Sequence, residues 1–550
     1  MRSLQLRIIQ SLIIILSMAS MLSSCSDQQS NVSAGNLSGT LHWGNGSEPQ
    51  SLDPHIATGV PEHHVISSLM EGLVFKDGET LEPRPGVAKS WDISDDGRVY
   101  TFYLRENARW SNGDPHNAHD YVWSWWRALQ PALGNLYAYM YFPIENARAY
   151  YEGQITDFEQ VGVKAIDDFT LEVRLTNPTP YFLQLLDHYS TFPVHRATVE
   201  KFGAADQRGT RWTYEGNIVG NGAFQLKEWK INRRITVERN PYYWNAQNVG
   251  LNQVVFYPTE NVTVEERMFR AGQLHYSNIP ADKIATYKQA NDPALRIKPY
   301  LGTYFFRINT QTPQLQDKRV RRALAMAINR DQLISQITKG GQLPAYAITP
   351  PGTMGYYPES DLKFDPVAAK QLLAEAGFAN GDNFPSVEIL YNTSEGHRKI
   401  AVAIQQMWKE NLNIDITLLN QEWKVYLDSV SGKNYQIARA GWIGDYVDPN
   451  NFLDMFICDG GNNRTNWCSP EYDQLILDKA PAAKSHAERL AIFAQAEKML
   501  LDAMPVIPIY IYTSINLVHP SVKNFQNNIL NQANYREIYL QPDPVQGDQQ

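Results

Sequence analysis

The chain has 550 residues and a mass of 62.6 kDa, more than one hydrophobic core usually serves, so we expect two or three lobes. Hydrophobic residues make up 43% of the chain and charged residues 19%, a composition that excludes a largely disordered protein. The net charge of −9 excludes the basic footprint of a nucleic-acid-binding protein.

At the N-terminus, two arginines precede an apolar run over residues 8–22, and the sequence Leu-Ser-Ser-Cys then ends at Cys25. This pattern is typical of an export signal rather than of a membrane-spanning helix. It resembles the lipobox of bacterial lipoproteins, in which the cysteine is acylated. We therefore interpret residues 1–24 as a lipoprotein signal peptide and Cys25 as the lipidation site. The alternative is an ordinary signal peptide cut nearby, and Ser26 leaves open which membrane holds the anchor or whether the protein is released.

The mature chain is predicted to start with a flexible tether. Residues 25–38 are rich in Ser, Asn and Gln and have hardly any apolar anchor, so the fold is expected to begin near Gly39. Alternating apolar residues then predict half-buried strands over 100–104 and 169–175. Between these strands, Tyr and Trp at helical spacing predict a packed helix over 117–129.

The second half of the chain shows a clearer order of elements. A helix is predicted over 366–376, with Asp365 as its N-cap and Gly377 as its stop. A strand, a helix and a strand then follow as a βαβ unit, before a shorter helix and a further strand. In chain order these five elements are expected over 387–391, 398–410, 413–419, 421–430 and 435–441.

Ligands of open α/β sheets bind outside the carboxyl ends of the strands. The strand predicted over 435–441 ends at Gly441, the first residue of the sequence Gly-Trp-Ile-Gly-Asp. Its position alone therefore marks Trp442 to Asp445 as a candidate binding segment.

With Cys25 assigned to the lipid, Cys458 and Cys468 remain, in a turn-rich segment of an exported protein. Thiols in such an oxidising compartment form disulfides, so we predict one bridge that closes a small loop. The alternative, a metal half-site made from the two thiolates, lacks nearby histidines at ligand spacing.

Signatures of catalysis are missing. The chain contains no G-x-S-x-G, no H-E-x-x-H and no G-x-x-x-x-G-K-[ST] motif. The adjacent His63 and His64, with His55 and Glu62 nearby, do not converge as metal ligands on one strand or helix. We expect no enzyme activity, no cofactor and no metal.

Several strings resemble the dipeptide- and oligopeptide-binding family, the extracytoplasmic receptors that serve peptide ABC importers, and in particular its oligopeptide- and murein tripeptide-binding members. The strings occur in the family's order across nearly the whole mature chain. They are GSEPQSLDPH (46–55), YTFYLR (100–105), WSNGD (110–114), GNIV (216–219), YNTS (391–394) and ARAGW (438–442).

This resemblance implies an α/β periplasmic binding protein of the type II-like class with three lobes. The ligand is expected to lie enclosed between lobes I and III. Lobe I is expected over 39–74, 201–301 and 513–540, lobe II over 75–200 and lobe III over 302–512.

The resemblance also implies the site residues. A receptor that reads many peptides has to grip the backbone and the two termini, which all peptides share. Asp445 matches the family's acid for the peptide ammonium, and Asp448 is its competitor, although a position before Pro449 favours a turn role. Glu62 matches an acid of the cleft.

For the peptide carboxylate, His397 and Arg439 match basic residues of the family. Two other basic positions of the oligopeptide-binding members are Val430 and Thr338 here, so Lys339 or Lys433 is a candidate replacement, as are waters. The preferred peptide length stays open for that reason. Four aromatic residues match walls of the side-chain pockets, with structural core as the alternative: Trp423, Trp442, Tyr137 and Tyr300.

The function implied is that of a monomeric solute-binding receptor that captures short peptides and delivers them to the membrane subunits of an ABC importer. It is expected in the periplasm or cell envelope of a Gram-negative cell, lipid-anchored through Cys25 and without nucleic acid. Three alternatives stand beside it. They are the same fold dedicated to one ligand, such as murein tripeptide, haem or a metal chelate, a cell-surface hydrolase, and a chaperone-like holder of unfolded chains.

Overall fold

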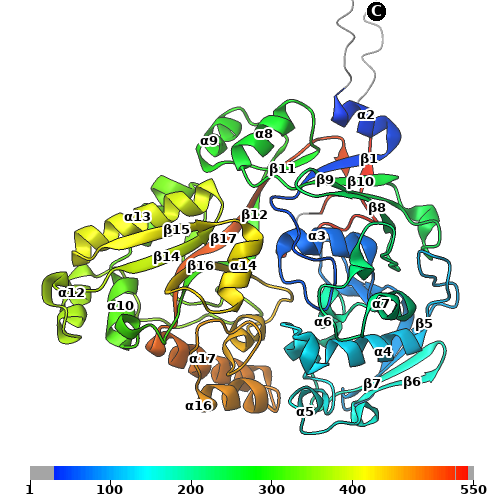
Figure 1. The fold of residues 1–550 in the computed structure, drawn as a ribbon, viewed down its shortest axis with the longest axis horizontal. Coiled ribbons are helices and arrows are strands. Elements are labelled where there is room, and N and C mark those ends of the chain that lie inside the picture. The colour runs from blue at the N-terminus through cyan, green and yellow to red at the C-terminus, as the bar shows by residue number, and fades with distance from the viewer. Residues whose placement is uncertain (1–29, 527, 543–550) are drawn as a thin grey trace, which may run out of the picture.

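The computed structural model describes residues 30–526 and 528–542, so Cys25 and the predicted signal peptide lie outside the described residues. A sheet of eleven strands dominates the fold, with the order β15-β14-β16-β12-β17-β11-β1-β10-β9-β8 and with β13 paired to β17 (Figure 1). Its members in chain order are β1 (Thr40–Gly44), β8 (Phe224–Lys230), β9 (Arg234–Arg239), β10 (Gln253–Tyr257), β11 (Tyr276–Asn278), β12 (Leu295–Ile308), β13 (Leu343–Pro344), β14 (Val387–Asn392), β15 (Ile416–Gln421), β16 (Ile437–Ile443) and β17 (Val506–Val518).

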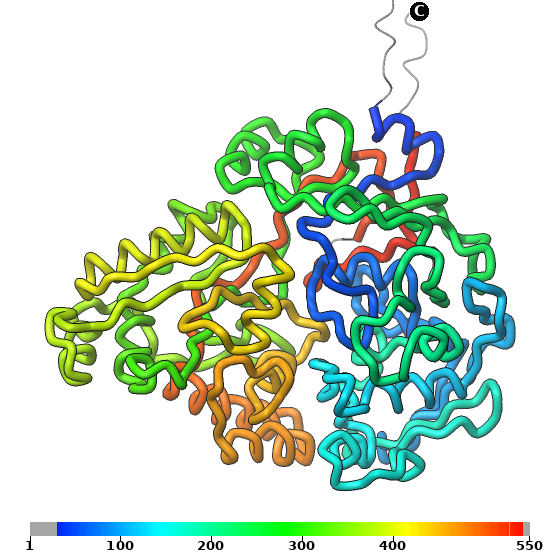
Figure 2. Tube along the Cα trace, in the orientation of Figure 1, coloured from blue at the N-terminus to red at the C-terminus, as the bar shows by residue number. Residues whose placement is uncertain are grey.

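Strands β12 and β17 join two parts of this sheet. On one side lies a first half-sheet of β11, β1, β10, β9 and β8, and on the other a second half-sheet of β16, β14 and β15. The antiparallel β12–β17 ladder shifts register between Pro299 and Thr303 and again between Tyr304 and Phe305, and such irregularities bend strands. Figure 2 shows β17, in red, running between the two parts of the molecule.

A separate antiparallel sheet lies below the first half-sheet in the view of Figure 1. Its order is β4 (Ala88–Ile93), β5 (Val99–Leu104), β7 (Thr170–Arg174) and β6 (Val163–Asp167). The two strands expected from alternation are therefore confirmed as β5 and β7. Two short ribbons complete the strands: β2 (Val74–Lys76) with β3 (Pro83–Pro85), and β18 (Val522–Lys523) with β19 (Tyr539–Leu540).

Helices cover these sheets. Residues of α10, α12 and α13 share one buried apolar cluster with β12 and β14. In chain order the α-helices are α2 (Asn31–Ser38), α3 (Val60–Leu69), α4 (Ala118–Ala128), α5 (Ala147–Tyr151), α6 (Phe182–Leu185), α7 (Arg196–Phe202), α8 (Val262–Arg270), α9 (Ala281–Gln289), α10 (Lys318–Met326), α11 (Arg330–Leu333), α12 (Pro366–Glu375), α13 (Glu395–Leu412), α14 (Trp423–Ser431), α15 (Asn450–Leu453), α16 (Pro470–Asp473) and α17 (His486–Ala503).

The predicted βαβ unit is confirmed. Strands β14 and β15 pair in parallel and α13 connects them, while β16 pairs in parallel with β14 on its other side. The helix expected over 366–376 is α12, where the Asp365 side chain accepts from the N–H of Ala368. The helix expected over 117–129 is α4, which a capping box between Asn117 and Asp120 starts.

The predicted tether is wrong for residues 31–38, which form α2. The Ser30 side chain caps its start and Gly39, with φ of 71°, ends it in the left-handed conformation that suits glycine. The helix is held to the first half-sheet by polar contacts, since Asn36 Oδ1 lies 3.1 Å from Nε2 of the buried His275. Composition alone misses such a helix because its anchor is an amide rather than an apolar stripe.

Cys458 and Cys468 form the predicted disulfide, with their Cα atoms 4.7 Å apart. Within the loop that it closes, Asn463 Nδ2 donates to the carbonyl oxygens of Phe456, Ile457 and Trp467. The loop is therefore fixed both covalently and by buried hydrogen bonds.

Replacing both cysteines with serine is expected to lower the free energy of unfolding by about 3 kcal/mol, because the open loop gains chain entropy in the unfolded state. Chemical denaturation of the wild type and of Cys458→Ser/Cys468→Ser, each with and without a thiol reductant, measures this difference. The reductant should destabilise the wild type and leave the variant unchanged. Equal stability of the two oxidised proteins contradicts the prediction.

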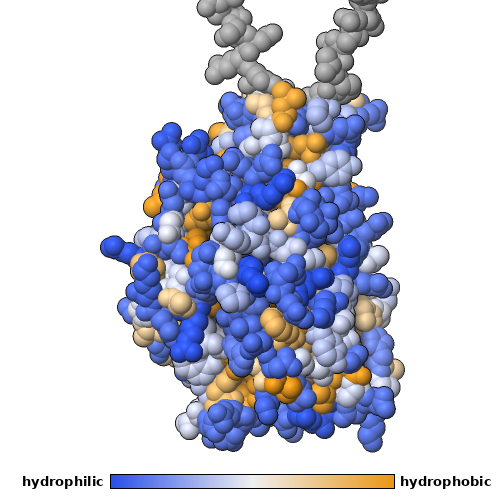
Figure 3. Space-filling model, turned by 90° about the vertical axis from the view of Figure 1, so that its right-hand side faces the viewer, coloured by the Kyte–Doolittle hydropathy of each residue, from blue (hydrophilic) through white to orange (hydrophobic). Residues whose placement is uncertain are grey.

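One side of the outer surface is mostly polar (Figure 3). Figure 3 shows the side of the molecule that lies at the right of Figure 1, where hydrophilic side chains predominate and hydrophobic ones gather mainly toward the lower end. Among the described residues, no helix combines the length and the apolar character that crossing a membrane requires.

Candidate ligand-binding cavity

A cavity of about 310 Å³ lies beside the carboxyl end of β16, a size at the low end of small-molecule sites. Its walls come from segments far apart in the sequence, including the start of α3, β12, α14, β17 and residues 530–532. All four residues from Trp442 to Asp445 line it, so the segment that the strand pattern marked does border a cavity.

Asp445 presents a carboxylate to this cavity. One oxygen, Oδ1, lies 3.3 Å from His188 Nε2, and the other, Oδ2, is buried and has no hydrogen-bond partner within the described residues. The backbone N–H of Asp445 donates to Asn451 Oδ1, which also accepts from Trp442 Nε1. Asn451 thus fixes Asp445 and the Trp442 indole together. Asp445 Oδ2 stays available for a donor from outside the described residues.

The surroundings of Asp445 come from another part of the chain. The backbone N–H of Ser190 donates to His188 Nδ1, and the other ring nitrogen, Nε2, faces Asp445. Lys76 Nζ donates to the carbonyl oxygen of Asp445 at 2.7 Å and lies 3.3 Å from Asp187 Oδ2. These contacts bridge the segment after β16 to the region 75–200.

Asp448, the competitor of Asp445, has its own partner. Arg489 donates to both carboxylate oxygens of Asp448, at 2.7 and 2.8 Å, and the N–H of Asn450 donates to Oδ1. The pair is buried, and a bidentate guanidinium satisfies the carboxylate. The geometry therefore leaves Asp445 as the free acid of the two.

Glu62 lies at the start of α3 and has no exposed surface. The N–H of Gln50 donates to its Oε1 at 2.6 Å, while Oε2 has no partner within the described residues. Burial raises the pKa of Glu62 to about 7, and the hydrogen bond from Gln50 opposes that rise. Glu62 itself does not line the cavity. Its carboxylate lies against Gly59, which does.

Three arginines line the end of the cavity formed by β12, β16 and the disulfide loop: Arg307, Arg439 and Arg464. Arg439 Nη1 donates to Asn392 at 3.3 Å and its Nη2 to Tyr512 at 3.0 Å, and the guanidinium lies over the Tyr304 ring. Arg307 and Arg464 are each 5% exposed. The Nε of all three is buried without a partner in the described part of the chain.

Two of these arginines are new relative to the sequence-based candidates. Arg307 falls in the apolar run Tyr-Phe-Phe-Arg-Ile of β12, and a charge inside a buried strand is the signal that could have found it. Arg464 lies in the disulfide loop, where no local pattern points to a cavity.

The other three cationic candidates lie outside the lining. Tyr304 Oη lies 3.4 Å from His397 Nδ1, and burial together with the Arg439 cation lowers the pKa of His397 well below its ordinary value, so the imidazole is neutral. Lys339 is exposed and Lys433 half-buried, both at positive φ in turns.

The four predicted aromatic residues all line the cavity. The Tyr137 and Trp442 rings lie 6.3 Å apart, and Trp423 stacks on Tyr426 at 5.7 Å. The Nε1 of Trp423 is buried without a partner among the described residues. Rigid aromatic walls of this kind contact ligand side chains at little entropic cost.

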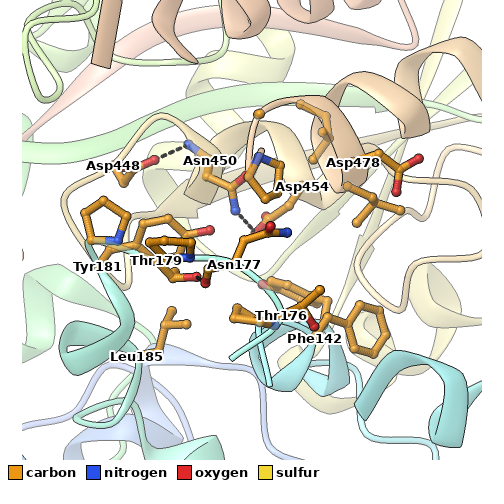
Figure 4. Close-up of a pocket in the computed structure, with 18 of the residues that line it drawn as sticks. Phe142, Thr176, Asn177, Thr179, Tyr181, Leu185, Asp448, Asn450, Asp454 and Asp478 are labelled. Carbon is orange, nitrogen blue, oxygen red and sulfur yellow. Dashed lines mark hydrogen bonds between the residues drawn. The ribbon is translucent and has the colours of Figure 1, made fainter. Parts of the chain in front are cut away.

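A larger cavity of about 670 Å³ lies between residues 139–185 and 446–489, shown in Figure 4. Its two buried acids are already engaged, Asp448 by Arg489 and Asp454 by Tyr446 and Asn450. Burial raises the pKa of Asp454 well above its ordinary value, which favours the neutral acid. The smaller cavity, where a carboxylate oxygen and guanidinium nitrogens without partners face one space, is therefore the candidate ligand site.

Two half-sheets joined by β12 and β17, with a cavity lined from both sides of this junction, are the architecture of a ligand-binding protein. Residues 82–464 match the family model of bacterial extracellular solute-binding proteins, family 5. The chain belongs to this family.

Named relatives agree with this assignment. The chain is 41% identical to the periplasmic oligopeptide-binding protein OppA of Salmonella typhimurium over 499 residues, which cover 88% of this chain and 89% of that one. Haemophilus influenzae OppA in complex with the peptide RPPGFSPFR superposes with a TM-score of 0.87 at 35% identity, covering 91% and 99% of the two chains.

Two structures of the murein tripeptide-binding protein MppA of Escherichia coli differ in how well they superpose on this protein. One of them matches ours with a TM-score of 0.87 at 37% identity, covering 91% and 98% of the two chains. The unliganded open form of MppA gives 0.61 at the same identity, covering 91% and 97%. Because the peptide complex of OppA also gives 0.87, our structure has the closed arrangement of the family.

The raised pKa of Glu62 predicts a pH-dependent difference between the wild type and Glu62→Gln. A carboxyl whose pKa rises from 4.5 to about 7 on folding stabilises the fold below pH 4.5 relative to higher pH, and this contribution is lost as the pH rises through 7. The amide does not titrate, so the variant should gain roughly 3 kcal/mol relative to the wild type between pH 4.5 and about pH 8.

Urea denaturation of both proteins across this pH range measures the gain. The exposed Glu79→Gln provides the matched control and should show no such gain. A difference between Glu62→Gln and the wild type that stays constant with pH would show that Glu62 is charged throughout.

Proposed function

We propose that this protein is the solute-binding receptor of an ABC importer and that it binds short peptides through their backbone and termini for delivery to the permease. The observation that carries the proposal is the pairing of a free carboxylate, Asp445, with unpaired guanidinium groups in one cavity. A peptide in solution carries a positive and a negative end, and these two groups complement it. The structure of the Haemophilus influenzae relative with the bound peptide RPPGFSPFR supports the same ligand class.

In this mechanism the peptide ammonium donates to Asp445 Oδ2, the oxygen that lacks a partner within the described residues. The terminal carboxylate meets Arg439, whose guanidinium Asn392 and Tyr512 already orient. Charge-assisted hydrogen bonds of this kind are about twice as strong as neutral ones. Tyr137, Trp423 and Trp442 then enclose the side chains.

Binding is coupled to closure of the lobes in the proposal. Lobe I over 39–74, 201–301 and 513–540 and lobe II over 75–200 approach lobe III over 302–512, with β12 and β17 as the hinge. Hydrogen bonds between the proposed lobes support this division. Gln50 Nε2 donates to Asp428 Oδ1 at 3.0 Å, and Lys76 Nζ donates to the carbonyl oxygen of Asp445. A peptide that contacts both sides favours the closed form, which the importer then recognises.

The proposal includes export and anchoring. Signal-peptide removal exposes Cys25 for acylation, which holds the receptor at the periplasmic face of a membrane. The receptor acts as a monomer and without enzyme activity, since its ligand is passed on intact. A role dedicated to one ligand is the second candidate, favoured by the 37% identity to the murein peptide-binding protein MppA.

Calorimetric titration with tri-alanine and N-acetyl-tri-alanine tests the proposal on Ser26–Gln550, stripped of carried-over ligand by unfolding and refolding. Tri-alanine is expected to bind and acetylation to abolish binding, because the blocked amine offers no charge to Asp445. The variant Asp445→Ala leaves the ammonium without its counter-ion, which costs about 3 to 5 kcal/mol, or roughly a 100-fold to 1,000-fold or greater loss of affinity.

The exposed Asp415→Asn is the control and should bind as the wild type does. If refolded protein binds neither peptide, general peptide binding is refuted and a dedicated ligand takes its place. Equal affinity for the free and the acetylated peptide would show that Asp445 does not bind the peptide ammonium.

A further inference from the structure

The cavity carries an excess of positive charge. Of the described residues that line it, Arg307, Arg439 and Arg464 are the cations that stay charged near neutral pH, and Asp445 is the one carboxylate. Burial keeps the lining histidines His63 and His64 neutral, since it lowers their pKa below the ordinary value. Three arginines against one aspartate leave two positive charges.

Arg307 and Arg464 have little inside the protein to balance them. No side-chain carboxylate of the described residues lies within 4.0 Å of either guanidinium. Arg307 Nη2 faces the sulfur of Met455 at 4.0 Å, and Arg464 donates no side-chain hydrogen bond in the described part of the chain. Burial, and after it the nearby Arg307 cation, lower the pKa of Arg464 to about 10, so the guanidinium is still protonated at neutral pH.

Such charges are costly in a closed cavity. A buried cation without a counter-ion loses its hydration and gains nothing in return, and two cations together also repel each other. The structure nevertheless fixes both side chains. Arg307 lies near the end of β12, between the neighbouring strands β16 and β17, with its guanidinium 5.4 Å over the Phe305 ring. Arg464 belongs to the disulfide loop, where the Tyr435 hydroxyl donates to its carbonyl oxygen. Fixed cations of this kind suit an anion that arrives with the ligand.

A zwitterionic peptide with neutral side chains does not supply this anion. Its ammonium is matched by Asp445 and its terminal carboxylate by Arg439, so it adds no net charge and leaves Arg307 and Arg464 unpaired. One acidic side chain adds a second carboxylate to the ligand. A planar carboxylate is also the group that a guanidinium binds with two parallel hydrogen bonds.

We propose that Arg307 and Arg464 form a pocket for an acidic side chain, so that the receptor prefers short peptides that contain glutamate or aspartate. This inference rests on the proposed peptide-binding function and names the substrate class of the same cavity. The preference belongs to the pocket and is separate from the grip on the two termini.

Competition calorimetry at one ionic strength tests the preference with three peptide pairs. Each pair replaces one alanine of tri-alanine, at the first, second or third position, with Glu in one peptide and Gln in the other. The two peptides of a pair have nearly the same shape and differ in charge. The Glu peptide is expected to bind at least tenfold more tightly than its Gln partner at one position or more, and a Lys peptide more weakly than both. Tri-alanine itself provides the reference for binding through the termini.

Arg464→Gln and Arg307→Gln should each bring the Glu-to-Gln affinity ratio close to one. Arg464 lies on a loop, so its variant keeps the test available if the β12 variant fails to fold. Arg319→Gln is the matched control, since Arg319 is exposed and paired with Asp317, and it should keep the wild-type ratio.

Equal affinity of the Glu and Gln peptides for the wild type at all three positions, with tri-alanine still bound, overturns the acidic pocket and leaves the proposed function intact. A preference for Glu that persists in both arginine variants overturns the assignment to Arg307 and Arg464. Failure of every peptide in the set to bind refutes the proposed function, and the pocket with it.

Discussion

The separation of unpaired charges across one closed cavity is the constraint on which the rest of the structure depends. At one end Asp445 Oδ2 lacks a partner, and at the other the Nε atoms of three arginines do, within the described residues. Proteins normally pair buried charges internally, as Arg489 does with Asp448, which lies three residues after Asp445 in the chain. Charges that a closed protein leaves unpaired identify the groups that its ligand has to bring.

The fold explains how these charges are held without partners. Asp445 follows β16, Arg439 lies on β16 and Arg307 on the neighbouring β12, so one pair of hydrogen-bonded strands fixes three of the four groups. Arg464 lies outside this sheet, and the disulfide between Cys458 and Cys468 anchors its loop instead. The disulfide therefore connects stability to recognition, because it restrains a cation that the sheet does not reach.

Part of this site follows from the sequence. The order of strand and helix signals over 387–441 predicts a parallel sheet, and the rule that ligands bind at carboxyl ends of strands leads to Trp442–Asp445. The family resemblance contributes the aromatic walls and Arg439. Arg307 carries a signal in the sequence, a charge inside an apolar strand, whereas Arg464 carries none. The role of both could not be predicted, because the pairing of buried charges is a property of the folded chain.

Two further features of the structure differ from what the sequence predicts or are not visible in it. Helix α2 was expected as tether because its buried anchor is Asn36 and not an apolar face. Sequence order does not show that Lys76 and His188 approach Asp445 from a region more than 250 residues away, since those contacts exist only where two lobes meet. Local patterns thus predict the elements, while contacts between distant segments decide the chemistry.

The most direct test of this account is a crystal structure of the protein with a bound acidic tripeptide. The account predicts the peptide in the cavity beside β16, with its ammonium at Asp445, its terminal carboxylate at Arg439 and its side-chain carboxylate between Arg307 and Arg464. A peptide found in the larger cavity between residues 139–185 and 446–489, with Asp445 and the three arginines still unpaired, would contradict it.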